Sequence, residues 1–563
     1  MATCNRRCRF RFNLFLGLSF LLFAISVSEG TARSQPSALP AAAGAAVDVE
    51  GEFEVLHEDF GKSGRYLYFL NTPSGQVPLH FNSKAPTNLL TGAHVRAHGT
   101  VDQSGTLILA SGGGVTNLSK TTPAPTAPLP NTFGAQSTLV ILVNFQDAPT
   151  NQPYTVAYAQ SVVFGTTSSF ILENSYQQTW LTGDVVGWYT IPVSSTTCSI
   201  WSIANYAQAA ASAAGINLSS YTRYVYAFPE NSACGFGGAS NVGGSPSQSW
   251  INGDGMETHI VAHELGHAFG LWHSHLLDCG ATATIGSNCT IWEYGDILDV
   301  MGAYQPASPH YDAFQKERLG WLNYGTSPSV TTVTAPGTYV INVYELGGSG
   351  PNALKIQKST DPTTGAKTWY YVESRKAVGF DAFLTNGTCG PCWDQTVTNG
   401  ALVHIGTDGN GSSGDLLDMT PATPTYYFWF DPSLAVGQSF QDPAAGVTLT
   451  TTAVTPVQAA VTVQFTGSVT VATDQPSYSP GQTVSTTATA TYAGAPISNV
   501  LVSFSITKAN GSVVTGSATT GSNGTAVYKL RLMKDDPAGT YLAAAATTIK
   551  GYPHNASINF LVQ

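Results

Sequence analysis

Charged residues are scarce in this sequence. Only 10% of the 563 residues are Asp, Glu, Lys or Arg, against roughly 25% in typical soluble proteins, so uncharged polar residues must form most of the surface. This composition is common in extracellular proteins. The formal net charge is −11 and no basic patch follows the N-terminal region. Both features argue against nucleic acid as a partner, because phosphate binding needs clustered Lys and Arg.

Long hydrophobic runs are absent beyond the N-terminus. Four arginines between Arg6 and Arg11 precede an apolar run over residues 12–27, and small residues follow that run. This order predicts a secretory signal peptide over residues 1–30, whereas the alternative, a membrane anchor, would need about 20 apolar residues. No later stretch reaches that length. We therefore expect a secreted protein with no membrane span after signal removal.

Six cysteines follow the predicted signal peptide, and an even number in an exported chain favours disulfides. Proximity suggests the pairs Cys198–Cys234, Cys279–Cys289 and Cys389–Cys392, although spacing alone leaves other connectivities open. The last pair has the Cys-x-x-Cys spacing of thioredoxin-type redox sites. No strand-to-helix pattern surrounds it, so a small structural disulfide is the preferred interpretation.

The chain length predicts three to five domains at about 150 residues each, and the fold class expected is multidomain α+β. Short alternating runs, of which Val47–Val55 is the first, predict an OB-like N-terminal β domain that is a candidate propeptide. The expected order is this N-terminal domain at 45–112, a Pro-rich linker at 113–133, a mixed α/β catalytic domain at 134–324, a β-rich companion domain at 325–466 and an immunoglobulin-like β-sandwich at 467–563.

Four segments of the mixed region carry clear patterns. The apolar run 137–145 predicts a buried strand, and 221–228 predicts a second strand. The Ala-rich segment 203–214 predicts a helix that ends at Gly215. The segment 256–269 predicts the helix that carries the motif described next.

The most informative segment is His263-Glu-Leu-Gly-His-Ala-Phe-Gly-Leu-Trp-His273. Two histidines four residues apart on a helix share one face and can bind one zinc ion, while Glu264 can reach a water on that ion. Gly270 lets the chain leave the helix sharply through positive φ. His273 can then return as the third ligand, after His263 and His267. Three protein ligands and an open fourth position are typical of catalytic zinc.

This arrangement predicts hydrolysis of peptide bonds. Zinc lowers the pKa of its water to about 7 and stabilises the developing oxyanion. Glu264 would act as general base and then pass the proton to the leaving amine. The five fixed positions arise by chance on the order of once in 10,000 chains. The alternatives are histidines that serve only packing, or a decayed site.

These eleven residues resemble the metzincin pattern of zinc endopeptidases. Metzincins also have a methionine turn downstream, and Met301 is similar in position to that methionine. Three further sequence segments resemble gametolysin-like peptidases, namely residues 139–147, 294–302 and 316–321. The resemblance covers about residues 135–325 and extends loosely to about 465. It implies a metzincin catalytic domain with one catalytic zinc ion and protein or glycoprotein substrates.

Two departures from the metzincin pattern matter. Some metzincins place a tyrosine two residues after the methionine to stabilise the oxyanion, but Tyr304 lies three residues after Met301. Matrix-type metzincins use a propeptide cysteine for latency, and no cysteine lies between Cys8 and Cys198. If the N-terminal β domain is a prodomain, it must block the zinc by another group, such as a carboxylate, or by steric hindrance.

Further candidates surround the motif. His275 is a rival third ligand, although the spacing from Gly270 favours His273, and His259 shares a helical face with His263 as a supporting residue. Asp296 and Asp299 could bind calcium or could cap and order their loop, and both interpretations stay open. The sequence therefore predicts a secreted zinc endopeptidase acting on extracellular proteins. The alternative is an extracellular adhesion or carbohydrate-binding protein with a vestigial metalloprotease domain.

Overall fold

The computed structural model describes residues 43–61, 63–118, 127–253, 255–304, 306–361, 363–384, 397–423, 431–549 and 552–563. The predicted signal peptide, the middle of the Pro-rich linker and the predicted Cys389–Cys392 pair lie outside these residues. Among the helices that the structure describes, none combines the length and the hydropathy needed to cross a membrane.

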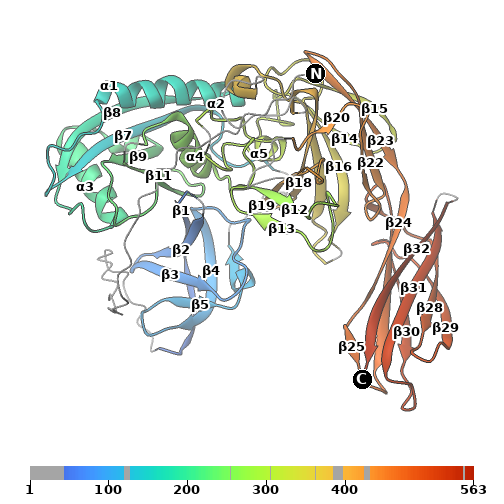
Figure 1. The fold of residues 1–563 in the computed structure, drawn as a ribbon. Helices are drawn as coiled ribbons and strands as arrows, with labels where there is room; N and C mark the ends of the chain where they lie inside the picture. Colours follow the sequence, from blue (N-terminus) through green and yellow to red (C-terminus); the bar gives the residue numbers. More distant parts are fainter. Residues whose placement is uncertain are drawn as a thin grey trace, which may run out of the picture.

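The N-terminal module, residues 43–118, is a small barrel (Figure 1). Its strands pair in the order β1-β2-β3-β5-β4, and a pairing of β4 with β1 closes the ring. Alternate residues of β4 are buried, as expected where one face of a strand covers a core. The strands are β1 (Ala46–Asp59), β2 (Gly64–Thr72), β3 (Gly75–Phe81), β4 (Ala93–Val101), β5 (Leu107–Leu109) and β6 (Val115–Asn117).

Strand β1 is longer than the predicted run, which ended at Val55. It continues to Asp59 because residues 56–59 pair antiparallel with β10 (Gly238–Asn241), a strand of the mixed α/β module. The register runs from Leu56 opposite Asn241 to Asp59 opposite Gly238. One eleven-stranded sheet therefore continues from the barrel into the mixed module.

The mixed module has parallel strands β7 (Gly134–Phe145), β8 (Thr179–Ile191), β9 (Arg223–Phe228) and β11 (Ser247–Asn252), with β10 antiparallel beside β11. The predicted run 137–145 lies in β7 and is buried on both faces. Val140 and Leu142 face one hydrophobic core, while Leu139 and Ile141 face the other. Helices cover both faces, which explains the continuous apolar sequence of this strand.

The first core is covered by α1 (Val156–Gln160), α2 (Ser168–Asn174) and α4 (Thr258–Phe269), and the second by α3 (Ile200–Ala213). A π-helical segment over Ser161–Thr167 joins α1 to α2. The predicted helix at 256–269 begins two residues late, because Glu257 is still extended and caps α4. The predicted helix at 203–214 begins earlier, at Ile200, and is followed by Gly215 with φ +89°.

The companion region contains two sheets that enclose a common core. The larger sheet has the order β13-β12-β19-β18-β17-β16-β14, and β12 comes from the mixed module, so strand pairing crosses the predicted boundary at 324. Helix α5 (Ala313–Arg318) packs on β17 and β18. The strands are β12 (Ser274–Asp278), β13 (Thr290–Trp292), β14 (Val330–Val333), β15 (Gly337–Asn342), β16 (Ala353–Thr360), β17 (Lys367–Glu373), β18 (Gly400–Thr407), β19 (Asn410–Leu417), β20 (Leu434–Ala435), β21 (Ser439–Asp442), β22 (Val447–Val454) and β23 (Gln458–Phe465).

The C-terminal module, residues 467–563, is an elongated pair of sheets beside the companion region (Figure 1). Val502, Phe504 and Ile506 are buried, as their alternation predicts. Val469 and Ala488 of one sheet share a core with residues of the other. The strands are β24 (Gly467–Thr473), β25 (Ser477–Tyr478), β26 (Thr483–Tyr492), β27 (Ala495–Pro496), β28 (Leu501–Thr507), β29 (Val513–Thr519), β30 (Thr525–Arg531), β31 (Gly539–Ile549) and β32 (Tyr552–Val562).

Two of the predicted disulfides are present. Cys198 pairs with Cys234, and Cys279 pairs with Cys289. The first links the segment before α3 to the segment before β10. The second closes the hairpin between β12 and β13, which lies next to the candidate metal centre.

Candidate metal centre

Helix α4 and the turn after it bring the three predicted histidines together. His263 and His267 lie one turn apart, and the helix ends at Gly270, which has φ +102°. The chain then reverses and returns His273 to the same point. The ring centroids are 4.9 Å apart for His263–His267, 4.9 Å for His267–His273 and 5.2 Å for His263–His273. All three side chains are buried.

Each of these histidines is oriented through its Nδ1 atom. Nδ1 of His263 lies 2.7 Å from the Val300 carbonyl oxygen, and Nδ1 of His267 lies 2.9 Å from the Leu271 carbonyl oxygen. Nδ1 of His273 lies 2.5 Å from Oε1 of Glu293. Hydrogen bonds of this kind fix the tautomer and the ring orientation of metal-binding histidines. They leave the three Nε2 atoms to face one centre.

The donor set fits a divalent metal ion. The Nε2 atoms of His267 and His273 are 3.2 Å apart, and the buried Nε2 of His263 has no hydrogen-bond partner. Ligands placed tetrahedrally at about 2.0 Å from zinc are separated by about 3.3 Å. When Nδ1 is the donor of each ring, Nε2 atoms this close are best satisfied by a cation between them. His263, His267 and His273 could therefore hold a zinc ion.

Glu264 lies at the same centre. It is 1% exposed, and its Oε2 atom has no hydrogen-bond partner. Burial, and then the nearby Asp59 carboxylate, raise the pKa of Glu264 well above its usual value. A ligand atom of Glu264 lies within 4.8 Å of those of His263 and Asp59. The Glu264 carboxylate can therefore reach a water or substrate atom at this centre without itself being a metal ligand.

Met301 lies beneath α4. Its side chain is fully buried, and its sulfur packs where a side chain on Gly266 would otherwise lie. The loop that carries it is ordered by carboxylates, since Oδ1 of Asp296 accepts the Leu298 amide at 2.8 Å and Oδ1 of Asp299 accepts the Met301 amide at 2.7 Å. These contacts favour the loop-ordering interpretation of both aspartates over calcium binding.

The companion sheet supports the same loop. Nε2 of His404, on β18, lies 2.9 Å from Oδ2 of Asp296. The buried guanidinium of Arg375 pairs with Glu373 and donates to the Leu298 carbonyl oxygen. The methionine loop is therefore clamped between α4 and the companion sheet.

Asp59 also enters this centre, and the sequence did not identify it. Its Oδ1 atom is 3.1 Å from Nε2 of His273 and 3.4 Å from Nε2 of His263, and its Oδ2 atom is 3.8 Å from Nε2 of His267. Burial alone would raise the pKa of Asp59, but the charges of His57 and His263 lower it well below its usual value. A carboxylate from the N-terminal barrel therefore lies among the three histidines.

A comparison with protein families assigns this part of the chain. Residues 173–387 match the family model described as gametolysin peptidase M11. The chain contains a gametolysin-like metallopeptidase. The matched segment includes α4, the three histidines, Met301 and the strands of the companion sheet up to β17. A metallopeptidase requires a metal ion, typically zinc, and takes protein substrates.

Comparisons with other known proteins are weak. No curated protein matches the chain. The D00-D0 domain of intimin is 18% identical, covers 42% of this chain and 95% of that chain, and has a TM-score of 0.16. Spo0M, a sporulation control protein from Bacillus subtilis, is 14% identical, covers 17% of this chain and 49% of that chain, and has a TM-score of 0.13. The chain thus spans about half the length of Spo0M.

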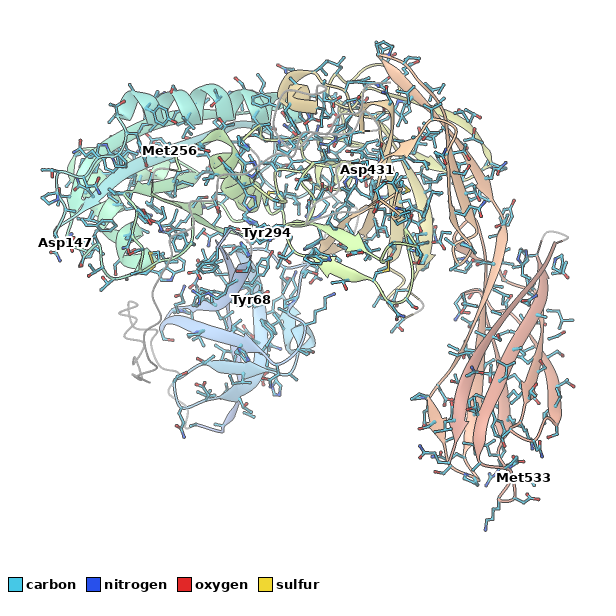
Figure 2. All side chains as sticks on the ribbon, in the orientation of Figure 1. Tyr68, Asp147, Met256, Tyr294, Asp431 and Met533 are labelled. Carbon is cyan, nitrogen blue, oxygen red and sulfur yellow. A yellow bond between two sulfur atoms is a disulfide. The ribbon has the colours of Figure 1, made fainter. Side chains whose placement is uncertain are left out.

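Two neighbours of the gametolysin-like motif were missed by the sequence analysis. Glu293 holds His273 through Oε1 and lies 3.3 Å from Nε2 of His275 through Oε2. Tyr294 donates from its hydroxyl to Oδ1 of Asp59 at 2.5 Å, and Figure 2 shows it where the barrel meets the mixed module. Both residues lie on the loop after β13, and no sequence spacing links that loop to the motif.

Three other sequence candidates lie around the centre. His275 sits between carboxylates, with Asp415 at 3.4 Å, and although burial alone would lower its pKa, the Asp415 and Glu293 carboxylates raise the pKa to about 10. Tyr304 is half exposed and donates to Glu257. The His259 ring lies 5.0 Å from that of Tyr304 and 6.2 Å from that of His263. His273 is thus the histidine that completes the centre.

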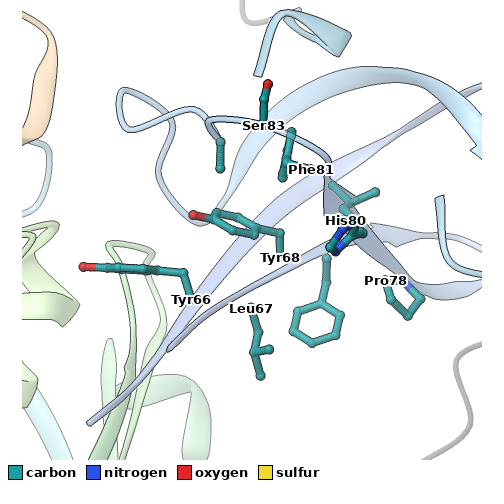
Figure 3. A pocket seen from close by; sticks show the side chains of 10 residues that line it. Tyr66, Leu67, Tyr68, Pro78, His80, Phe81 and Ser83 are labelled. Atoms are coloured by element: carbon teal, nitrogen blue, oxygen red, sulfur yellow. The ribbon is translucent and has the colours of Figure 1, made fainter. Parts of the chain in front are cut away.

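A surface pocket of about 300 Å³ lies on the barrel rather than at the histidines (Figure 3). Tyr66, Tyr68 and Phe81 line it, together with Pro78 and Ser83. Tyr66 connects it to the gametolysin-like segment, because its ring lies 4.6 Å from that of Trp272. This contact helps to attach the barrel to that segment.

Proposed function

We propose that this protein is a secreted zinc-dependent endopeptidase that hydrolyses peptide bonds of extracellular proteins. The observation that carries the proposal is the convergence of three Nε2 atoms, each with its Nδ1 atom held by an oxygen, on a point that Glu264 also reaches. Three histidines are the donor set of one class of catalytic zinc site, and here a carboxylate lies beside them. His263, His267 and His273 would hold the ion.

A bound zinc ion would supply a Lewis acid that activates a water and polarises the substrate carbonyl. Glu264 would accept the proton of the attacking water and then donate it to the leaving amine. Its burial suits this role, because a carboxylate whose pKa is raised holds a transferred proton better near pH 7. The histidines would position the metal ion, and Glu264 would transfer the proton.

Tyr294 is proposed as the donor to the substrate oxygen. Its hydroxyl lies 2.5 Å from Oδ1 of Asp59, an oxygen that sits 3.1 Å from His273. An oxygen of the substrate at the same position would receive the same hydrogen bond. Donors aimed at a developing negative charge contribute strongly to catalysis. Tyr304 is less suited to this role because its hydroxyl is directed to Glu257.

Secretion is supported by the two disulfides and by the basic and apolar start of the sequence. The closed five-strand order of the barrel supports an OB-like fold, and the two facing sheets of residues 467–563 support an immunoglobulin-like sandwich. We propose that these modules flank a metzincin-type catalytic unit.

Casein hydrolysis tests the proposed function. Because Asp59 lies among the histidines, wild-type and Asp59→Ala proteins are both assayed after loading with zinc. Chelation should remove the activity, and Glu264→Ala should lower it by about 100-fold to 10,000-fold, the range of general acid–base catalysis. Glu230→Ala changes an exposed carboxylate of the same module and is the matched control, which should keep the activity. Hydrolysis that resists chelation, or none in either background, would contradict the proposal.

A further inference from the structure

The carboxylate of Asp59 lies at the distances from the histidine Nε2 atoms that are expected of a fourth metal ligand. Its Oδ1 atom lies 3.1 and 3.4 Å from the Nε2 atoms of His273 and His263, and the Nε2 atoms of His267 and His273 are 3.2 Å apart. All three separations agree with the edge of about 3.3 Å expected for a tetrahedral zinc site. We propose that Asp59 is the fourth protein ligand of the metal ion and that, on the proposed peptidase function, it holds the full-length protein inactive.

The carboxylate is held on both sides. Tyr294 donates to Oδ1 at 2.5 Å, and Nδ1 of His57 lies 3.1 Å from Oδ2. Both partners are buried, and so is the carboxylate itself. A buried carboxylate is stable only when it is paired and hydrogen-bonded. This side chain is therefore fixed in the centre rather than passing near it.

The backbone of Asp59 is equally constrained. Residues 56–59 pair with β10, the Gly237 amide donates to the Asp59 carbonyl oxygen at 2.9 Å, and the Val242 amide donates to the Val55 carbonyl oxygen at 2.9 Å. Strand β10 itself pairs with β11 on its other edge. With β1 in place, both edges of β10 are occupied, and no extended substrate can add to this strand.

Aromatic packing secures the barrel next to the ligands. Trp272, the residue before His273, is 1% exposed and belongs to the hydrophobic core of the barrel. The Tyr66 ring lies 4.6 Å from it, and the His57 ring lies 4.3 Å from that of His273. Separation of the barrel would expose this aromatic surface to water. The closed arrangement is therefore the stable one.

The consequence is a carboxylate block. A carboxylate at the fourth position excludes the water that the proposed reaction needs. If the barrel is a prodomain, it needs a blocking group other than cysteine, because none lies between Cys8 and Cys198, and Asp59 is such a group.

Binding of acetohydroxamate, a small zinc chelator, tests whether the fourth position is blocked. The zinc-loaded full chain is titrated by calorimetry as wild type, Asp59→Ala and Asp59→Asn. If about 1% of the wild type is open, it should bind the probe about 100-fold more weakly than Asp59→Ala. Asp48→Asn is the matched control, because Asp48 is an exposed carboxylate of the same strand, paired with His98 at 3.1 Å. Equal affinity of wild type and Asp59→Ala would overturn the proposal.

A crystal structure of the zinc-loaded wild type gives the same answer without a variant. Asp59 Oδ1 is expected within about 2.2 Å of the zinc ion, and a water in that position would overturn the proposal. Hydrolysis is measured separately on the same samples, and Asp59→Ala should exceed wild type about 100-fold. If Asp59→Ala binds the probe tightly and hydrolyses no casein, the ligand assignment stands and the peptidase function fails.

Discussion

The two terminal β modules relate to the gametolysin-like segment in different ways. The N-terminal barrel shares a sheet with it, buries Trp272 in its own core and places Asp59 among the histidines. The C-terminal module contacts the companion sheets, through the Ser468 hydroxyl to the Ala444 carbonyl oxygen at 2.6 Å and the Gln357 amide to the Gly494 carbonyl oxygen at 2.9 Å. Both modules consist of β-strands, but the N-terminal barrel reaches into the site, whereas the C-terminal module is only attached to the companion sheets.

The largest effect on catalysis is expected from a change in β10, the strand of the mixed module that pairs with the barrel. Gly238 pairs with Asp59, and a methyl group on it would collide with the carboxylate of Glu264. In the Asp59→Ala background, Gly238→Ala should therefore lower kcat/KM for casein by about 100-fold or more, because displacement of a general base costs that much.

The control for this change lies in the C-terminal module. Gly521→Ala places its methyl group no closer than 3.4 Å to Oδ1 of Asn523, so kcat/KM should be unchanged. A Gly238→Ala protein with normal kcat/KM would show that Glu264 has room to move and is not held by β10. Equal losses in the two variants would remove the distinction between the modules.

A smaller effect is expected from removing a side chain of the mixed module that orients a metal ligand. Glu293 holds Nδ1 of His273 and pairs with His275. Glu293→Gln should weaken zinc binding by about 10-fold to 100-fold, the usual effect of losing such an orienting carboxylate. Competition with a chelating dye measures the dissociation constant. Glu52→Gln changes an exposed carboxylate of β1 and should leave zinc affinity intact, whereas equal affinities for both variants would exclude this role of Glu293.

Local and distant contacts explain which parts of the site were predictable. The spacing of His263, Glu264 and His267 is set by one helix, and Gly270 turns the chain as its lack of a side chain predicts. These features depend on neighbouring residues, so the sequence shows them. Met301 was found through resemblance to a family, although its position under Gly266 depends on packing.

Asp59 could not be located in this way. It lies 214 residues before His273, and its position depends on pairing between β1 and β10 that no local pattern encodes. The missing cysteine indicated only that a prodomain, if present, would block the zinc by a carboxylate, by another group or by steric hindrance, and it pointed to no residue or strand. Tyr294 was also hidden, because it sits in a loop with φ +57° whose path is set by tertiary contacts. The barrel and the sandwich were expected as β modules, whereas their unequal attachment was not.

The companion sheet lies between both modules, and its buried histidine gives a pH-dependent contribution to stability. Burial alone would lower the pKa of His404, but the charges of Asp312 and Asp296 raise it to about 9. A histidine with a raised pKa stabilises the fold fully below its unfolded pKa of about 6.5, and this contribution is lost as pH rises to about 9.

The difference in unfolding free energy between wild type and His404→Gln should therefore shrink by on the order of 3 kcal/mol between pH 6.5 and 9. Urea unfolding of the two proteins at both pH values measures it. His94→Gln, at an exposed position of the barrel, should show no such change. A pH-independent difference for His404→Gln would mean that the Asp296 contact is not an ion pair.

The smallest effect is expected from removing the C-terminal module. Deletion of residues 467–563 in the Asp59→Ala background should leave kcat/KM for a short peptide within about twofold, because distant and independent parts of a protein act additively. The same deletion tests whether attachment is the module's whole role, since casein and the peptide should respond alike. A fall for casein of about 10-fold with an unchanged peptide rate would instead assign the module to binding of large substrates. The N-terminal barrel would then block the site, and the C-terminal module would recruit its substrate.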